Sequence, residues 1–500
     1  MSDRRGTGRA GPERRRTRNA PAAAPAPAPA PVFTRVNGTV WKPRERADAL
    51  LTAPLITQTG EMLPAAVLDI ELSEPLPAIA AVDAGGRRVA QAWMLVRLFT
   101  EPIGTLLADV PDGGMRPAGV AAAIDAALGT ALRPRLAELS VGVLTGPGAG
   151  RSPALPIDGI TPVTEPAFLA RRRAVLATAP QIKIVICTRE RPGALARCLD
   201  SLLALRYPNF SILVVDNAPT TEATSEVVRA AARLGPIRYV VEPRAGLSFA
   251  RNAAVAAAPG EILAWIDDDE VADPDWLAEV ARALADHPEA DVVSGVIVPA
   301  ELETPAQLWF EQFGGHSKGR GFRPDVFGPA TAHRQSPLYP LPPFGTGANM
   351  TFRPGVIERI GGFDTALGAG TPAMGSEDTL AFTQVLVGGG TIVYQPSAIT
   401  YHYHRRDVEG LHKQMVGYGS GLTAAYTGLL LRRPGLLWPL LKLIPTALRD
   451  LTGADSLRVA TLGDDFPREL LAANRRGMLA GPLAYLRGRR AARAQTRRAR

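Results

Sequence analysis

The sequence predicts an α/β protein built around a mixed, mainly parallel β-sheet flanked by helices. From residue 181 onward, short apolar runs alternate with helical patterns, which is typical of parallel strands joined by crossover helices. Polar side chains follow the apolar runs where each strand would end. The chain has 500 residues, 46% of them hydrophobic and 21% charged, so its composition is globular and its length indicates two or three units.

Three segments are expected before residue 181. Residues 1–31 are basic and then alternate Ala with Pro, which predicts a disordered arm because this composition cannot bury a core. Residues 32–150 contain apolar runs at 65–72 and 90–99 and a helical pattern at 118–139, and predict a small α/β domain of unknown role. Residues 151–180 predict a linker with one short helix.

The catalytic unit is expected at residues 181–415. Its first half, 181–298, predicts strands at 182–187, 211–216, 237–241, 261–267 and 292–298, with helices at 192–205, 222–234, 247–257 and 274–285. Its second half, 299–415, begins with an irregular, Gly-rich stretch that we interpret as a lid or acceptor loop. A helix at 379–387 and a strand ending at Tyr401-His402-Tyr403-His404 follow. Residues 416–500 predict a helical, basic tail.

The acidic triplet Asp267-Asp268-Asp269 follows an apolar strand. Open α/β sheets bind ligands at the carboxyl ends of their strands. Adjacent carboxylates repel one another, and oxygen ligands suit Mg²⁺ or Mn²⁺, so we expect a divalent metal shared with a substrate diphosphate. The alternative is that the triplet caps the following helix. Asp273 suits the cap and Pro274 the first helical position, so the triplet needs no capping role.

Further polar residues end the neighbouring strands on the same edge. They are Thr188, Arg189, Arg191, Asp216, Asn217, Glu242 and Arg244. In a bound nucleotide, such side chains could hydrogen-bond the base, the carboxylates could bind a ribose or a metal, and the arginines could bind phosphates. The turn after the first strand contains neither GxGxxG nor GxxxxGK[ST], which argues against a dinucleotide-binding dehydrogenase and a P-loop NTPase.

These residues resemble glycosyltransferase family 2. The resemblance rests on Cys187-Thr188-Arg189-Glu190-Arg191-Pro192, Val214-Val215-Asp216-Asn217, Gly246-Leu247-Ser248-Phe249-Ala250-Arg251-Asn252 and Asp267-Asp268-Asp269, and continues through Gly345-Thr346-Gly347-Ala348-Asn349-Met350, Gly361-Gly362-Phe363-Asp364, Glu377-Asp378 and His402 to Arg406. It covers about residues 182–418. It implies a GT-A fold, a nucleotide-sugar donor and a divalent metal.

The resemblance also implies roles for individual residues on the donor side. Thr188, Arg189 and Asp216 would line the base site, Asp268 would hold the ribose, and Asp269 with Asp267 would bind the metal. Arg191, Asn217 and Arg251 complete the expected nucleotide-sugar site. For Arg251 a surface salt bridge is the alternative, because exposed helix arginines are common.

On the acceptor side, the family pattern implies that Asp378 is the catalytic base, with Glu377 holding the acceptor or orienting the base. Inverting transfer needs one carboxylate to take the proton of the incoming hydroxyl. The alternative is that both acids only stabilise a helix start. Asn349 and Trp309 are assigned to the acceptor, although Trp309 also fits a helix face packed on the core.

His402 and His404 alternate along one strand and therefore share a face. Either could complete the metal site or grip the diphosphate. We favour His404 slightly because Arg405 and Arg406 follow it, and each histidine alone could equally be a core residue.

The tail, the charge and the cysteines suggest a location. Residues 415–431 carry no charge but are diluted by Gly and Thr, so interfacial helices are preferred to a membrane span, with a helix docked on the catalytic unit as the alternative. The net charge of +8 comes largely from Arg-rich terminal segments without interleaved aromatics, which argues against nucleic acid as a partner. With two isolated cysteines and no apolar leader, we expect a cytoplasmic protein, peripheral at the inner membrane face.

The sequence therefore predicts a metal-dependent, inverting glycosyltransferase. It would move one sugar from a UDP-, dTDP- or GDP-sugar to a hydroxyl of a glycan, or of a lipid-linked or cell-envelope acceptor; residues 414–418 lack the QxxRW pattern of processive synthases. The alternatives are a sugar-phosphate nucleotidyltransferase, although no GxGxRL-like loop follows the first strand, and a non-catalytic nucleotide-sugar binding protein. The hypothesis requires Asp267 to Asp269 and Asp378 to face one cleft.

Overall fold

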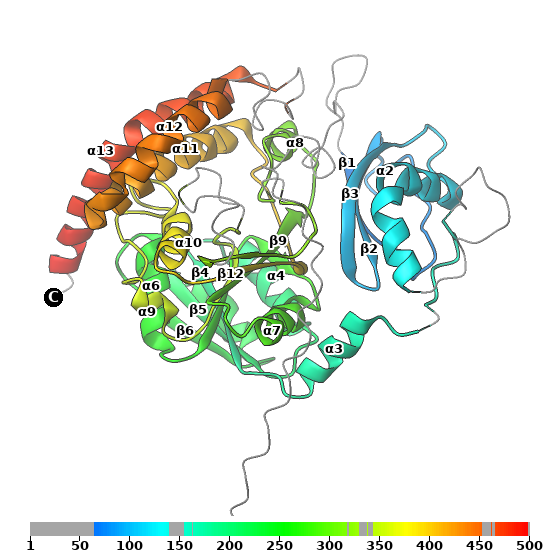
Figure 1. Cartoon of the computed structure of the whole chain (residues 1–500), viewed down its shortest axis with the longest axis horizontal. Helices are drawn as coiled ribbons and strands as arrows, with labels where there is room; N and C mark the ends of the chain where they lie inside the picture. The colour runs from blue at the N-terminus through cyan, green and yellow to red at the C-terminus, as the bar shows by residue number, and fades with distance from the viewer. Residues whose placement is uncertain are drawn as a thin grey trace, which may run out of the picture. The chain divides into compact units, whose positions relative to one another are not determined.

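The central element of the computed structural model is a mixed β-sheet, nine-stranded among the described residues (Figure 1). The structure describes residues 65–139, 155–162, 164–317, 320–329, 338, 344–452, 462 and 466–498. The arm predicted at residues 1–31 lies outside these ranges, as do parts of the predicted linker and of the Gly-rich stretch.

One half of the sheet is parallel, as predicted. β4 (Ile182–Thr188) lies between β5 (Phe210–Asn217) and β7 (Ile262–Ile266), and β6 (Ile237–Glu242) follows β5, all parallel. β4, β5 and β7 are rich in Val, Ile and Leu because the helices cover both faces of the sheet. The crossover helices are α4 (Pro192–Leu203), α5 (Ala223–Ala231), α6 (Leu247–Ala257) and α7 (Trp276–Asp286).

The other half of the sheet contains antiparallel pairs. β11 (Asn349–Phe352) is antiparallel to both β7 and β9 (Val292–Pro299), and β12 (Ile392–His402) runs parallel to β9. Two short strands, β8 (Glu270–Ala272) and β10 (Asp325–Phe327), pair with β12. The predicted strand set omitted β8, β10 and β11, because three or four residues are too few to show a period.

An aromatic cluster supports the strand end that carries the acidic triplet. Trp265 of β7 meets the rings of Phe352 and Phe363 edge-on, each with centroids 5.7 Å apart, and Phe352 stacks on Phe382 of α10 (Glu377–Val387). All four side chains are buried. This packing fixes α10 against the sheet at β7 and β11.

Of the small α/β unit predicted at residues 32–150, residues 65–139 are described, and they share a core with the large sheet. β1 (Ala65–Glu71), β2 (Gln91–Leu98) and β3 (Glu101–Asp109) form a three-stranded sheet with α2 (Pro117–Glu138), and α3 (Ala167–Leu176) is the helix predicted in the linker. Trp93 and Leu95 of β2 pack with Val296 and Val298 of β9. The small unit therefore packs directly against β9 of the large sheet.

The C-terminal segment is helical, as predicted. α11 (Val408–Arg432) packs along α13 (Arg468–Arg498), and α12 (Leu437–Thr452) follows a short 3₁₀ turn, η3 (Pro434–Leu436). A Cβ on Gly419 would lie 1.9 Å from Asn474 O, and one on Gly477 2.2 Å from Val416 O, so only glycines permit this close helix contact.

The long uncharged stretch lies within α11, where Met415, Ala424 and Leu429 are buried. Residues 415–431 therefore form a docked helix, and the preferred interfacial position is wrong for this stretch. In the described part of the chain, no helix is both long and apolar enough to cross a membrane.

Candidate active site

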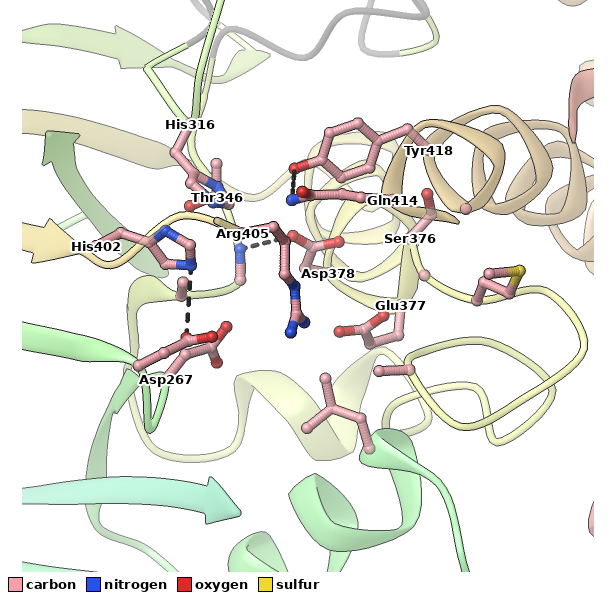
Figure 2. Close-up of a pocket in the computed structure, with 18 of the residues that line it drawn as sticks. Asp267, His316, Thr346, Ser376, Glu377, Asp378, His402, Arg405, Gln414 and Tyr418 are labelled. Carbon is pink, nitrogen blue, oxygen red and sulfur yellow. Dashed lines mark hydrogen bonds and ion pairs between the residues drawn. The ribbon is translucent and has the colours of Figure 1, made fainter. Parts of the chain in front are cut away.

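One cavity of about 930 Å³ brings the two distant acidic clusters together. Asp267, Asp268 and Asp269 line one wall, and Glu377 and Asp378 line the opposite one. In Figure 2, Asp267 and His402 lie on one side, Glu377 and Asp378 on the other, and the Arg405 side chain extends between them. The volume suits a ligand of nucleotide-sugar size.

The triplet forms the turn between β7 and β8. Asp268 accepts hydrogen bonds from Thr188 Oγ1 at 2.6 Å and Arg191 Nη1 at 3.0 Å, and Asp269 accepts one from the same guanidinium at 2.8 Å. His402 Nε2 lies 3.4 Å from the second carboxylate oxygen of Asp269. Arg191 and the strand-end residue Thr188 therefore fix the acids from the side of β4.

The electrostatics separate the members of the triplet. Burial favours the neutral form of Asp269, but His402 and Arg191 outweigh it and hold its pKa well below the usual range. Desolvation raises the pKa of Asp267 to about 6, although Arg251 opposes it. Carboxylate oxygens and imidazole nitrogens are donor types that suit Mg²⁺ or Mn²⁺, and Asp269, Asp267 and His402 all line the cavity. Among the described residues, however, the group whose ligand atoms already lie within 4.8 Å of one another is His316, His402 and His404.

The two predicted histidines occupy different places. His402 lines the cavity, whereas buried His404 is not among the lining residues and bonds through Nε2 to Glu311 Oε1 at 2.7 Å. The geometry thus favours His402 as the residue that meets a metal, in contrast to the slight preference for His404. His316 lies nearby, and one ring nitrogen each of His316, His402 and His404 lie within 4.8 Å of one another.

The opposite wall begins α10. Ser376 adopts φ of 65° before the helix, a region that non-glycine residues rarely enter. Asp378 Oδ2 accepts a hydrogen bond from the backbone N of Gly347 at 2.6 Å, and Oδ1 accepts one from Thr379 N at 2.6 Å. A Cβ on Gly347 would lie 2.8 Å from both Asp378 Cβ and Arg251 Nη1, so glycine is required for this approach.

Arg251 connects the two walls. Its side chain is only 2% exposed, with Nη1 3.1 Å from Glu377 Oε1 and Nη2 3.8 Å from Asp267 Oδ1. The alternative of a surface salt bridge is therefore excluded. Burial raises the pKa of Glu377 to about 7, since it outweighs the opposing effect of Arg251 and is reinforced by Asp378.

Most predicted donor-side residues line this cavity: Thr188, Arg189, Arg191, Asn217, Arg251, Asp267, Asp268 and Asp269. Asp216 is not among them, because it is fully buried and accepts a hydrogen bond from Tyr239 at 2.7 Å. Asn217 also has a structural task, since its side chain bonds Arg244 O at 2.7 Å and Gly246 N at 2.8 Å.

Of the two predicted acceptor residues, Asn349 lies in the interior and Trp309 is half-buried. Asn349 bonds Ala398 O at 2.8 Å, Val296 O at 3.0 Å and Trp276 Nε1 at 2.9 Å, so it joins β9, β12 and α7. Trp309, on α8 (Pro305–Gln312), packs against a hydrophobic cluster that includes Phe466 and Leu470. Neither residue lines the cavity, and the structure does not support their acceptor role.

Several lining residues were missed by the sequence reasoning. His316 and Arg320 lie in the Gly-rich stretch, and Gln414 and Tyr418 lie on α11, where Gln414 Nε2 donates to the Tyr418 hydroxyl at 3.0 Å. The local sequence around His316 and Arg320 has no periodicity, so no pattern could have assigned them to a site.

The mixed sheet, with an acidic turn at its edge and a second carboxylate pair across the cavity, has the architecture of a GT-A glycosyltransferase fold. Residues 183–361 match the family model described as Glycosyl transferase family 2. The chain therefore contains a glycosyltransferase family 2 domain, in agreement with the resemblance seen in its motifs.

Two curated relatives match part of the chain. A glucosyl-dolichyl phosphate glucuronosyltransferase of Haloferax volcanii is 25% identical over 198 residues, which cover 38% of this chain and 57% of the relative. The succinoglycan biosynthesis protein ExoM of Rhizobium meliloti is 30% identical over 225 residues, which cover 43% of this chain and 65% of the relative. The chain thus matches less than two thirds of the length of each.

Among solved structures, the mannosyltransferase PcManGT of Pyrobaculum calidifontis, in complex with GDP-Man and Mn²⁺, is similar at a TM-score of 0.36 and 20% identity. The match covers 66% of this chain and 81% of that one.

Proposed function

We propose that this protein is a metal-dependent, inverting glycosyltransferase that moves one sugar from a nucleoside-diphosphate sugar to a hydroxyl group. The observation that carries the proposal is the single cavity with Asp269 and His402 on one wall and Asp378 on the other. Donor and acceptor need such a space between a metal-binding turn and a base.

Each wall has a task in this mechanism. A divalent metal held by Asp269, Asp267 and His402 would stabilise the negative charge that develops on the leaving diphosphate. Asp378 takes the proton of the incoming hydroxyl, and the Gly347 N–H holds its carboxylate in place. The acceptor oxygen bonds to the anomeric carbon as the bond from that carbon to the diphosphate breaks. One displacement inverts the configuration and needs no nucleophilic residue.

The arginines complete the donor site. Arg405 extends between the two walls and would neutralise charge on the diphosphate (Figure 2). Arg189 lines the nucleotide edge next to Thr188. Buried Arg251 pairs with Glu377 and so keeps that acid ionisable beside Asp378, where it would hold the acceptor or orient the base.

The acceptor is proposed to be lipid-linked or part of the cell envelope. The names of the two relatives refer to a glucosyl-dolichyl phosphate and to succinoglycan biosynthesis, which supports a lipid-linked or cell-envelope acceptor. The outer side of α12 supports a position at a membrane surface, because Leu437, Trp438, Leu441 and Ile444 are 40–72% exposed there. Leu440 and Leu443 on the same helix pack inward, and Lys442 and the neighbouring Arg433 would face anionic headgroups at the cytoplasmic leaflet.

Donor hydrolysis tests the proposed function. The wild-type protein, with Mn²⁺ and a panel of UDP-, GDP- and dTDP-sugars, is expected to release nucleoside diphosphate from one of them. In Asp269→Asn this release should fall on the order of 100-fold or more, because the metal loses a carboxylate ligand. Asp286→Asn, at the end of α7 and away from the cavity, is the matched control.

The same assay discriminates the alternatives. A sugar-phosphate nucleotidyltransferase would instead release pyrophosphate from a nucleoside triphosphate and a sugar phosphate. A binding protein would retain nucleotide affinity with no release from any donor, and this result would reject the enzymatic proposal.

A further inference from the structure

Three histidine rings meet beside the acidic triplet, although they come from distant segments of the chain. One ring nitrogen each of His316, His402 and His404 lie within 4.8 Å of one another. The ring centres of His316 and His402 are 4.3 Å apart, and those of His402 and His404 are 5.0 Å apart. Three imidazole nitrogens that converge in this way are close enough to share one metal ion.

His402 and His404 turn their outer nitrogens to carboxylates and their inner nitrogens to each other. His404 Nε2 lies 2.7 Å from Glu311 Oε1, and His402 Nε2 lies 3.4 Å from Asp269 Oδ1. The two Nδ1 atoms are 2.8 Å apart. Histidines that bind a metal usually donate their other ring N–H to a carboxylate, a carbonyl or water, which fixes the ring and makes the ligand nitrogen more basic. Both rings therefore have the outer partners that support metal ligands.

His316 reaches this pair through a tight turn after α8. Gly315 adopts φ of 51°, and a Cβ at this position would lie 2.3 Å from Glu311 Oε1. Glycine is therefore required for the chain to fold back over the carboxylate that holds His404. The Phe310 ring contacts both histidines edge-on, with centroids 5.1 Å from His316 and 4.7 Å from His404. The turn and the ring together fix His316 next to its neighbours.

The distances and the donor types suit a transition metal. Zn²⁺ is held by imidazole nitrogens at about 2.0–2.1 Å, so two ligand nitrogens of a tetrahedral site are about 3.3 Å apart. To reach this spacing, the Nδ1 atoms of His402 and His404 would open by about 0.5 Å, and the His316 nitrogen would approach by at most about 1.5 Å. Imidazole suits Zn²⁺, Co²⁺ and similar ions, whereas Mg²⁺ prefers oxygen ligands.

We propose that His316, His402 and His404 form a second metal site, which binds Zn²⁺ or a similar transition metal beside the triplet. Metal binding replaces the hydrogen between the two Nδ1 atoms and releases that proton to solvent. His402 then keeps the hydrogen on Nε2 and donates it to Asp269, so this nitrogen is withdrawn from a metal held by the triplet. The histidine site itself is independent of the proposed function, whereas its effect on the donor metal rests on that function.

Cobalt(II) absorption tests the site in the full-length protein. Four-coordinate Co²⁺ absorbs visible light much more strongly than six-coordinate Co²⁺ with oxygen ligands, so the spectrum separates the histidine site from the triplet. The variants are His316→Gln, His316→Cys, His404→Gln and Asp267→Asn. His287→Gln, at the end of α7 and outside the cavity, is the matched control. Thermal melting without metal checks that each variant is folded.

The wild type should bind Co²⁺ with the intense spectrum, and Zn²⁺ should displace it. His316→Gln and His404→Gln should weaken this binding on the order of 100-fold, because even a change in an outer partner costs about 10- to 100-fold. Asp267→Asn and His287→Gln should retain the spectrum. His316→Cys should restore binding and add a near-ultraviolet band from thiolate to cobalt. Only the weak six-coordinate spectrum in the wild type, or wild-type affinity in His316→Gln, would reject the site.

Titration of Mn²⁺ by electron paramagnetic resonance, with and without Zn²⁺, tests the effect on the triplet. Zn²⁺ should weaken Mn²⁺ binding about 5- to 150-fold, the usual range for coupled sites, and Mn²⁺ should weaken Zn²⁺ binding by the same factor. His316→Gln should lose this response. The sharing of His402 is rejected if Zn²⁺ leaves Mn²⁺ affinity unchanged in the wild type, or weakens it equally in His316→Gln, since the two ions would then compete for the triplet alone.

Failure of this inference can be told from failure of the proposed function. A protein that hydrolyses a donor with Mn²⁺ but gives no four-coordinate Co²⁺ spectrum would lose the histidine site and keep the transferase proposal. A protein that hydrolyses no donor would lose the transferase proposal, while the Co²⁺ spectrum, recorded without any donor, would still decide the histidine site.

Discussion

The Nδ1 atoms of His402 and His404 lie 2.8 Å apart, and this contact links a chain of hydrogen-bonding groups that runs from Glu311 to Asp269. The carboxylate of Glu311 can only accept, so His404 Nε2 carries a hydrogen. Burial lowers the pKa of His404, which favours its neutral form and makes its Nδ1 an acceptor. His402 then donates from Nδ1, and its Nε2 faces Asp269 at 3.4 Å; a metal bound there would take the place of the hydrogen on Nε2.

Glu311→Gln should therefore weaken Mn²⁺ binding about tenfold, because outer hydrogen-bond partners tune metal affinity by this order. An amide can donate as well as accept, so the variant no longer fixes the hydrogen on His404 Nε2. Titration of free Mn²⁺ by electron paramagnetic resonance measures the affinity directly. Glu303→Gln, which removes an exposed partner of Arg406, is the control; equal Mn²⁺ affinity in both variants would contradict the proposed chain.

Asp378→Asn should reduce sugar transfer roughly 10²- to 10⁴-fold, the contribution of a positioned general base. Asparagine keeps an oxygen that can accept from Gly347 N but cannot take a proton. Affinity for Mn²⁺ and nucleoside diphosphate should change little, since Asp378 lies on the other wall. Single-turnover transfer and nucleotide titration separate the two effects, and loss of nucleotide affinity alone would assign Asp378 to the donor site.

Glu377 should make the metal-free protein less stable as pH rises. Its pKa is raised to about 7 in the folded protein from an ordinary 4.5, so the folded state binds more protons than the unfolded state between these values. Stability is therefore lost as pH rises from about 4.5 to 7, by an amount on the order of 3 kcal/mol. Urea unfolding in EDTA should show a shallower loss for Glu377→Gln than for the wild type.

The control for this measurement is Glu358→Gln, which changes an exposed acid. It should retain the wild-type slope. If Glu377→Gln and Glu358→Gln show the same dependence on pH, then Glu377 is not the group responsible.

The buried ion pair between Arg97 of β2 and Asp273 should stabilise the attachment of the small sheet. Their charged atoms lie 2.7 Å apart, both side chains are under 10% exposed, and Arg97 also bonds the Tyr401 hydroxyl next to His402. Arg97→Met leaves Asp273 unpaired and should cost about 3–5 kcal/mol of unfolding free energy. Arg87→Met, at an exposed pair, should cost under about 1 kcal/mol; similar losses in the two variants would refute the claim.

Trp438→Ser should reduce binding to vesicles that contain phosphatidylglycerol by about tenfold, because a 72% exposed Trp on α12 would lose its place in the headgroup region. Co-sedimentation measures the bound fraction, and pure phosphatidylcholine vesicles should bind the wild type more weakly. Leu234→Ser, which removes another exposed apolar side chain, is the control. Wild-type binding by Trp438→Ser would argue against this membrane surface.

The parallel half of the sheet was predictable from the sequence, because its strands and helices are long enough to show their periods. β4, β5, β6 and β7 all appear close to their predicted bounds. The same reasoning placed Thr188 and the acidic triplet at one edge, since parallel strands bring their carboxyl ends together. The antiparallel strands β8, β10 and β11 were not predicted, because their pairing depends on distant partners and not on a local pattern.

The sequence by itself determined which residue types stand at the strand ends and that they resemble a glycosyltransferase family. Only the tertiary structure decided which of them meet. It brought Asp378 to the triplet across one cavity, turned His402 toward Asp269 and His404 toward Glu311, and directed Asn349 into the interior. The physical reason is that alternation along a strand assigns a face, whereas the partner on that face comes from segments a hundred residues away, whose approach is set by packing.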